Sequence, residues 1–372
     1  MMNILCIFAV TAAGDIHGIV SAAATEQHRT TARTMAKNMS ATAPLLWYEK
    51  IFFGILYTLI WSVSILPLRV LYIFSDGLYL LVYKVVGYRR RVVRKNLSLS
   101  FPEKSEAERR VIEREFYHFF CDYIFETIKL ATISKEEMRR RLSVSGMEHI
   151  ERAIRNGRSV SIFLGHYCNW EWVTGFGLFL PEEAFLGQVY HVLESKVMDR
   201  LLLKVRSRMG SENIPMAEIM RRLVKERSNG QLVIIGFISD QSPIVYNVPY
   251  WTTFMNQPTP FINGTERLTK KLDMTAVYLD ITRMKRGHYQ LNVVLMAEET
   301  KKIPDWQLTQ QYAELLEASI RRQPPYWLWS HNRWKRKPED FYNAVAKDKQ
   351  PNTQASNGKG QGTNNDNGQW FH

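Results

Sequence analysis

Short apolar runs alternate with helical patterns over the middle and C-terminal parts of this chain, and this alternation restricts the fold most. Each run has six or seven residues, the length of a buried strand, and helical patterns lie near 146–156, 194–208, 215–228, 262–272 and 305–321. Such alternation predicts an α/β fold, with a mixed central sheet flanked by helices. The runs are Ser159–Leu164, Ala184–Tyr190, Leu232–Ile238, Thr275–Ile281 and Gln290–Met296.

An uncharged apolar run precedes this region. Ile51–Leu68 has 18 residues without a charged side chain. As a helix it would be about 27 Å long, close to the roughly 30 Å hydrocarbon thickness of a bilayer. It predicts a membrane anchor, and a buried helical hairpin over Ile51–Tyr83 is the alternative. The next apolar segment, Val70–Tyr83, contains Asp76 and is shorter, which favours an interfacial or re-entrant helix over a second span.

Five basic residues follow the apolar segments: Arg89, Arg90, Arg91, Arg94 and Lys95. Positive charge flanking a membrane segment favours the cytoplasmic side, so we expect the rest of the chain there.

Four regions are expected along the chain. They are an N-terminal extension (1–44), the anchor with its basic flank (45–95), a main domain (96–341) in which Ser105–Leu130 is helical, and a disordered polar tail (342–372).

Charge and cysteine content restrict the functional classes. The 49 Lys and Arg outnumber the 36 Asp and Glu, giving a net charge of +13, which favours acidic partners such as anionic lipid, nucleic acid or an acidic carrier protein. Three dispersed cysteines are too few for a disulfide framework or a zinc site. No Gly-rich phosphate loop or Cys/His cluster is present, so no metal or cofactor is expected.

His166 and Glu171 follow the first apolar run and have the residue types of a general base and its orienting carboxylate. Five steps along a helix would leave the two side chains about 140° apart, so His166 must lie at the strand exit. Asn169 is expected to cap the next helix and to line the substrate site, with Glu171 in the first helical turn. The alternative is a buried histidine beside a solvated glutamate. Cys168 offers a rival mechanism through an acyl-enzyme.

Further candidate side chains follow other elements. Arg206 and Arg208 end a helix and suit phosphate or carboxylate binding, although cations at helix C-termini are also common for structural reasons. Asp240 follows a strand, where it binds substrate or an arginine, or caps a turn. Near the C-terminus, aromatic and basic residues mix over Tyr326–Pro338. The upstream anchor favours a membrane-headgroup role for this mixture over nucleic-acid binding.

Four sequence blocks resemble the late acyltransferases of lipid A biosynthesis, the lauroyl and myristoyl transferases of the bacterial inner membrane. They are the His166-x4-Glu171 motif, Arg206-Ser-Arg-Met-Gly-Ser211, Ser239-Asp-Gln-Ser-Pro243 and Tyr326–Pro338, in order within residues 45–341. The resemblance implies a glycerolipid-acyltransferase-like fold in which His166 and Glu171 are catalytic and Arg206, Arg208, Asn169 and Asp240 bind substrate.

The resemblance also implies the partners. The donor would be an acyl carrier protein thioester, and the acceptor a hydroxyl of a Kdo-bearing lipid A precursor, at the cytoplasmic face of the inner membrane among membrane lipids. No nucleic-acid partner is expected. Two alternatives stay open: acylation of another lipid, such as a glycerophospholipid, an amino-acid lipid or a glycolipid, and a non-catalytic basic membrane scaffold.

Overall fold

A seven-stranded sheet forms the centre of the protein. The computed structural model describes residues 44–243 and 250–339. The sheet order is β1–β9–β8–β2–β5–β3–β4, and only the β8–β9 pair is antiparallel. The predicted mixed α/β fold is therefore confirmed. The strands are β1 (Leu142–Ser145), β2 (Val160–Leu164), β3 (Phe185–Tyr190), β4 (Glu212–Pro215), β5 (Val233–Ile238), β8 (Thr275–Lys285) and β9 (His288–Ala297).

All five predicted apolar runs are strands of this sheet. β2 lies between β8 and β5, and all five of its residues are buried, which explains why the run lacks polar alternation. The sequence prediction missed β1 and β4, which have four residues each, and a separate antiparallel pair formed by β6 (Trp251–Phe254) and β7 (Gln257–Pro260).

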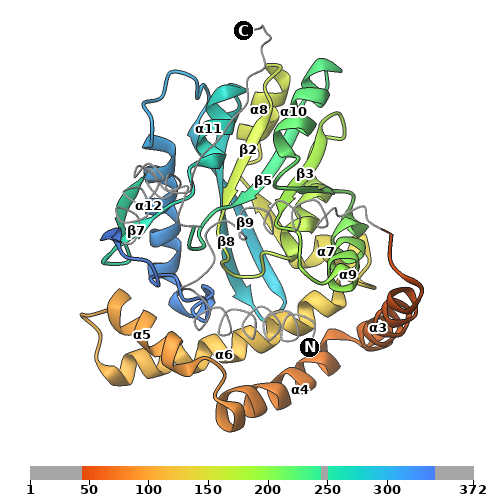
Figure 1. Cartoon of the computed structure of the whole chain (residues 1–372), viewed down its shortest axis with the longest axis vertical. Helices are drawn as coiled ribbons and strands as arrows, with labels where there is room; N and C mark the ends of the chain where they lie inside the picture. Colours follow the sequence, from red (N-terminus) through yellow and green to blue (C-terminus); the bar gives the residue numbers. More distant parts are fainter. Residues whose placement is uncertain (1–43, 244–249, 340–372) are drawn as a thin grey trace, which may run out of the picture.

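Helices surround the sheet (Figure 1), and those predicted are present. The predicted helix over Ser105–Leu130 is α6 (Glu106–Lys129), whose first turn is fixed by reciprocal hydrogen bonds between Ser105 and Glu108. The other helices of the main domain are α7 (Lys135–Arg141), α8 (Glu148–Arg155), α9 (Lys196–Arg206), α10 (Ile219–Ser228), α11 (Gly264–Lys271) and α12 (Gln307–Arg322), with short 3₁₀ helices η2 (Trp172–Phe179), η3 (Ser207–Met209) and η4 (Pro324–Tyr326).

The predicted anchor is α3 (Trp47–Ile65). Among residues 44–243 and 250–339, it is the one helix that is by itself long enough and apolar enough to cross a membrane. Only 11% of its apolar stretch is buried. That exposure contradicts the buried-hairpin alternative for α3. Its C-terminal end is held by α6, where the Lys129 ammonium donates to the Ser64 and Leu66 carbonyls at 2.9 and 3.0 Å. A cation is favourable there because the last carbonyls of a helix lack intrahelical partners.

The second apolar segment forms α4 (Leu68–Tyr79) and the π-helical turn η1 (Leu80–Val86), followed by α5 (Arg90–Ser100). The axis bends by 92° between Leu68–Val86 and α5. Leu71 and Tyr79 are buried, whereas Ile73 and Phe74 are exposed. An interfacial or re-entrant position for this segment stays a prediction.

α4, α5 and α6 lie across one end of the sheet (Figure 1). Tyr123 of α6 contacts Glu171, which follows β2, and Asn96 of α5 donates to the Trp329 carbonyl at 2.8 Å. These helices therefore cover the edge where β2 ends. The predicted region boundaries stay predictions, and the N-terminal extension (apart from Pro44) and the polar tail lie outside the described residues.

Candidate active site

His166 lies at the exit of β2, as the spacing argument predicted. Gly165, just before it, allows close packing: a Cβ there would lie 2.7 Å from Leu316 Cδ1 of α12 and 3.4 Å from Asp240 Oδ2. Tyr312 of α12 donates its hydroxyl to the Leu164 carbonyl at 2.8 Å. The end of β2 is thus fixed by α12, and the His166 side chain keeps 20% exposure.

The carboxylate that contacts His166 is Asp240, which follows β5. His166 Nδ1 lies 2.6 Å from Asp240 Oδ1, and the His166 backbone N–H donates to Oδ2 at 3.0 Å. Trp327 Nε1–H donates to Oδ2 at 2.8 Å. Because β2 and β5 are adjacent parallel strands, their carboxyl ends bring these residues together. The sequence prediction that Glu171 orients the imidazole is wrong for this contact.

Asp240 is ionised at neutral pH. Burial by itself would raise its pKa, but the His166 charge and the hydrogen bonds from His166 and Trp327 lower the pKa to about 2. Its side chain is 2% exposed. Its contact is with the histidine, and the prediction that Asp240 binds substrate stays a prediction, which this burial does not favour.

The His166 side chain is 20% exposed, and its other imidazole nitrogen, Nε2, lies beside Gln241. The Gln241 amide nitrogen lies 3.2 Å from it and can donate to its lone pair. With the Nδ1 proton held by a carboxylate, Nε2 is the free base of the ring. Sequence reasoning named Gln241 only as part of a motif and gave it no contact.

Glu171 is buried and paired with Arg206 instead. Arg206 Nε and Nη2 donate to its two carboxylate oxygens at 2.7 and 2.5 Å, and the Tyr123 hydroxyl donates at 3.3 Å. Burial would raise the Glu171 pKa, but Arg206 lowers it below the ordinary value, with Tyr123 and His166 contributing. The alternative of a solvated glutamate is wrong, because the side chain is 3% exposed.

Asn169 also has internal contacts. Its amide nitrogen donates to Glu126 Oε2 at 2.6 Å and its oxygen accepts from the Trp172 N–H at 3.1 Å. It therefore caps the first turn of η2, as predicted. Its side chain is 1% exposed, so substrate binding by Asn169 stays a prediction, which this burial does not favour.

The two arginines of the basic block already have protein partners. Arg206 binds Glu171. Arg208 donates from Nη1 to the carbonyl of Leu130, the residue that follows α6, at 2.5 Å. Substrate binding by Arg206 and Arg208 stays a prediction, which these contacts do not favour.

The C-terminal aromatic segment pairs with the residues around His166. Leu328 N–H donates to the His166 carbonyl at 3.2 Å and Cys168 N–H donates to the Tyr326 carbonyl at 2.8 Å. Trp327 and Trp329 are 2% and 0% exposed. The headgroup-interface interpretation is wrong for these two tryptophans, because both are buried. Trp327 contacts Asp240, and Trp329 packs against Trp327.

Cys168 is buried beside the site, with its thiol 3.6 Å from the Ile281 carbonyl. Burial raises the pKa of this thiol well above its ordinary value. Since the thiolate is the nucleophile, these surroundings oppose the acyl-enzyme alternative.

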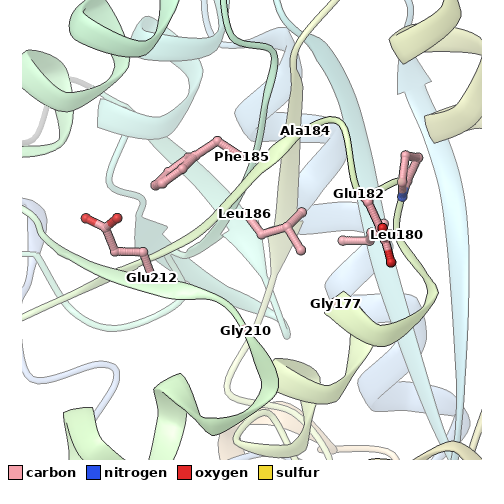
Figure 2. A pocket seen from close by; sticks show the side chains of 9 residues that line it. Gly177, Leu180, Glu182, Ala184, Phe185, Leu186, Gly210 and Glu212 are labelled. Carbon is pink, nitrogen blue, oxygen red and sulfur yellow. The ribbon is translucent and has the colours of Figure 1, made fainter.

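A cleft of about 390 Å³ lies away from His166. Figure 2 shows Phe185, Leu186 and Glu212 around it. Phe185 and Glu212 begin β3 and β4, so the cleft opens at the amino ends of parallel strands, whereas His166 and Asp240 follow carboxyl ends. The cleft is therefore separate from the candidate active site. In residues 44–243 and 250–339, no group of three or more His, Cys, Asp or Glu side chains is placed to hold a metal ion.

Comparison with known families identifies the class of enzyme. A family model described as bacterial lipid A biosynthesis acyltransferase matches residues 36–336. The chain belongs to this family. It is therefore an acyltransferase of lipid A biosynthesis, and the matched range includes every candidate site residue named above.

Curated relatives support the assignment over most of their length. The chain is 26% identical over 298 residues to the lipid A biosynthesis lauroyltransferase of Escherichia coli (strain K12), covering 80% of this chain and 94% of the relative. It is 24% identical over 300 residues to the palmitoleoyltransferase of the same strain, covering 79% and 93%. A shorter match, 31% over 115 residues, covers 31% of this chain and 35% of the myristoyltransferase of that strain.

Proposed function

We propose that this protein transfers a fatty acyl chain from an acyl carrier protein thioester to a hydroxyl of a Kdo-bearing lipid A precursor, with His166 as the general base. The observation that carries the mechanism is the 2.6 Å contact between His166 Nδ1 and the buried, ionised Asp240. It leaves Nε2 as the nitrogen that faces substrate.

The reaction would proceed by direct transfer. Nε2 of His166 removes the proton of the acceptor hydroxyl as the oxygen attacks the thioester carbonyl, and Asp240 stabilises the imidazolium that forms. Collapse of the tetrahedral intermediate breaks the carbon–sulfur bond, and the imidazolium returns its proton to the leaving thiolate. No covalent enzyme intermediate is needed, because the thioester is already activated.

In this proposal Glu171 does not contact the reacting atoms and acts on His166 indirectly. Its bidentate pair with Arg206 joins the turn after β2 to the end of α9, and Asn169 joins the same turn to Glu126 of α6. We propose that these contacts position His166, which replaces the direct orienting role expected of Glu171.

Membrane attachment and charge support the proposed substrates. The outer face of α3 exposes large apolar side chains, including Trp47, Ile55 and Leu59 at 74%, 57% and 60%. The net charge of +13 favours approach of an acidic carrier and an acidic lipid. We propose that α3 anchors the enzyme in the inner membrane with the sheet on the cytoplasmic side, where carrier thioesters are made.

Mass spectrometry of products tests the proposal. Purified full-length protein in detergent is incubated with a mixed acyl carrier protein pool and a Kdo-bearing tetra-acylated precursor, beside His166→Ala and a matched histidine control, His149→Ala on α8. We expect a mass increase of one acyl chain with the native and control proteins, and a rate lower by about 10³ or more with His166→Ala.

Three results would contradict the proposal. Transfer by a folded His166→Ala protein at the native rate would remove the histidine mechanism. Transfer only to a glycerophospholipid or another glycolipid, offered in parallel reactions, would replace the acceptor and leave the histidine mechanism in place. A scaffold without activity would show no increase with any acceptor, yet His166→Ala would still complement a strain that lacks the gene.

A further inference from the structure

Three cations near the candidate active site have no carboxylate partner among the described residues. Arg89 immediately precedes α5, and Lys335 and Arg336 follow the buried aromatic segment at the C-terminal end of the described chain. By contrast, neighbouring Arg90 and Arg94 both lie within 3.5 Å of the buried Glu113 carboxylate. The three side chains form what we call the basic cluster: Arg89, Lys335 and Arg336.

A series of short contacts joins this cluster to the reacting histidine. Arg89 Nη1 donates to the Ser330 carbonyl at 3.0 Å. The next residue, His331, accepts from the Ser242 N–H at 3.2 Å, and Gln241 lies 3.2 Å from His166 Nε2. The basic cluster is therefore linked, through Ser330–His331 and Gln241–Ser242, to the residue that lies beside His166 Nε2.

Asn96 fixes the loop that carries this connection. Its amide nitrogen donates to the carbonyls of Trp329 and His331, both at 2.8 Å, and its side chain is buried. These two hydrogen bonds join α5 to the 329–331 loop, so the fold fixes the position of the loop that links the cluster to His166.

Arg89 is held in a backbone conformation that favours glycine. Its φ is +50°, in the left-handed region that disfavours residues with a Cβ. A cationic side chain at this strained position is consistent with a role for the guanidinium itself. Val85 and Val86, shortly before it, are 76% and 54% exposed. Arg89 therefore closely follows an exposed apolar segment in the sequence.

The three charges repel one another. Burial lowers the pKa of Lys335, and the neighbouring charges of Arg336 and Arg89 lower it further. The Arg336 Nε atom is buried without a hydrogen-bond partner. His331 stays neutral, since burial lowers its pKa to about 3, so it leaves the excess charge on the cluster. An anion bound here would relieve the repulsion and supply the missing acceptor.

We infer that Arg89, Lys335 and Arg336 form a subsite for a phosphate group of the acceptor lipid. The inference rests on the proposed function and deepens it. A guanidinium pair binds phosphate bidentately, whereas Arg206 and Arg208 already bind protein groups. A phosphate held by the basic cluster would orient the acceptor lipid so that one hydroxyl reaches His166 Nε2, which sets the position that is acylated.

A binding assay in an inactive background tests this subsite without requiring turnover. Full-length His166→Ala protein is titrated, in micelles of a neutral detergent, with a phosphorylated acyl disaccharide, its dephosphorylated analogue, and phosphatidylglycerol. We expect Arg336→Gln to weaken binding of the phosphorylated disaccharide by about tenfold to a hundredfold, because one charge-assisted contact is lost. Binding of the other two lipids should change less than about twofold.

Two companion variants separate ligand binding from folding. Arg89→Gly relieves the left-handed strain but removes the guanidinium and its bond to the Ser330 carbonyl. These effects on stability oppose each other, so the melting temperature should change little, although phosphate binding weakens to a similar degree. Arg336→Lys should keep part of the affinity. Arg221→Gln on α10, an 81% exposed position paired with Glu218, is the matched control and should bind like the parent.

Two outcomes would overturn the inference. Equal weakening for phosphatidylglycerol would make the cluster a general membrane contact, and unchanged binding of the phosphorylated disaccharide in Arg89→Gly and Arg336→Gln would remove the subsite. Failure of the proposed function is distinguishable: native protein would then show no acyl transfer, while phosphate-dependent binding in the His166→Ala background would remain.

Discussion

Two buried carboxylates at one edge of the sheet hold cations in different ways. Asp240 contacts His166, an imidazole that can accept and donate a proton and whose side chain is 20% exposed. Glu171 binds Arg206 bidentately, and that partner is always charged. The first pair can take part in proton transfer, whereas the second can only join two elements. The proximity of Glu171 to His166 in sequence therefore does not make it the histidine's partner.

Replacing Asp240 gives the largest expected effect that separates the pairs. Asp240→Asn removes the charge opposite the imidazolium. With the amide oxygen accepting from Trp327 and the His166 N–H, its NH2 group faces Nδ1, so we expect kcat to fall by about 10² to 10⁴ with little change in KM. Steady-state transfer rates with carrier thioester and lipid acceptor measure this. A variant that folds and retains the native kcat would show that the contact has no catalytic role.

Replacing Glu171 should affect stability more than chemistry. Glu171→Gln leaves the Arg206 charge without its partner, and we expect the free energy of unfolding to fall by about 3 kcal/mol, the low end for a buried pair because Arg206 keeps 21% exposure. Denaturant unfolding followed by tryptophan fluorescence measures this loss.

The matched control for Glu171 removes both charges. Glu171→Gln with Arg206→Met should recover part of the lost stability, since no unpaired charge then remains. If Glu171→Gln lowered kcat as much as Asp240→Asn while the protein stayed fully stable, the division of roles between the two carboxylates would be wrong.

Acid stability should distinguish Asp240 from a neutral replacement. The folded-state pKa of about 2 lies below the ordinary 3.8, so Asp240 stabilises the fold above about pH 4, and this contribution is lost as the pH falls towards 2. We expect native protein to lose about 2 kcal/mol more than Asp240→Asn across that interval. Unfolding measured at several pH values tests this, and parallel curves for the two proteins would contradict it.

The smallest expected effect concerns Cys168. Cys168→Ala should change the transfer rate less than about twofold, because a buried thiol with a raised pKa is a poor nucleophile. The free energy of unfolding should fall by about 1 kcal/mol from lost packing. A rate loss as large as that of His166→Ala would instead support an acyl-enzyme.

Much of the architecture followed from sequence pattern. Apolar runs such as β2 and β5 were recognisable because buried central strands lack polar alternation, and α6 was recognisable from its period. Short β1 and β4 were missed because four residues are too few to show a period. Trp327 and Trp329 were misinterpreted because aromatic residues next to cations have the same composition at a membrane surface and in a core wall.

The sequence by itself determined that His166 stands at a strand exit and that α3 is apolar enough to be an anchor, because both depend on local spacing and composition. Only the tertiary structure decided which carboxylate meets the imidazole. Asp240 is 74 residues from His166 in sequence yet 2.6 Å away, since the parallel pairing of β2 with β5 aligns their carboxyl ends. Glu171, five residues away, is instead bound by Arg206 at the end of α9.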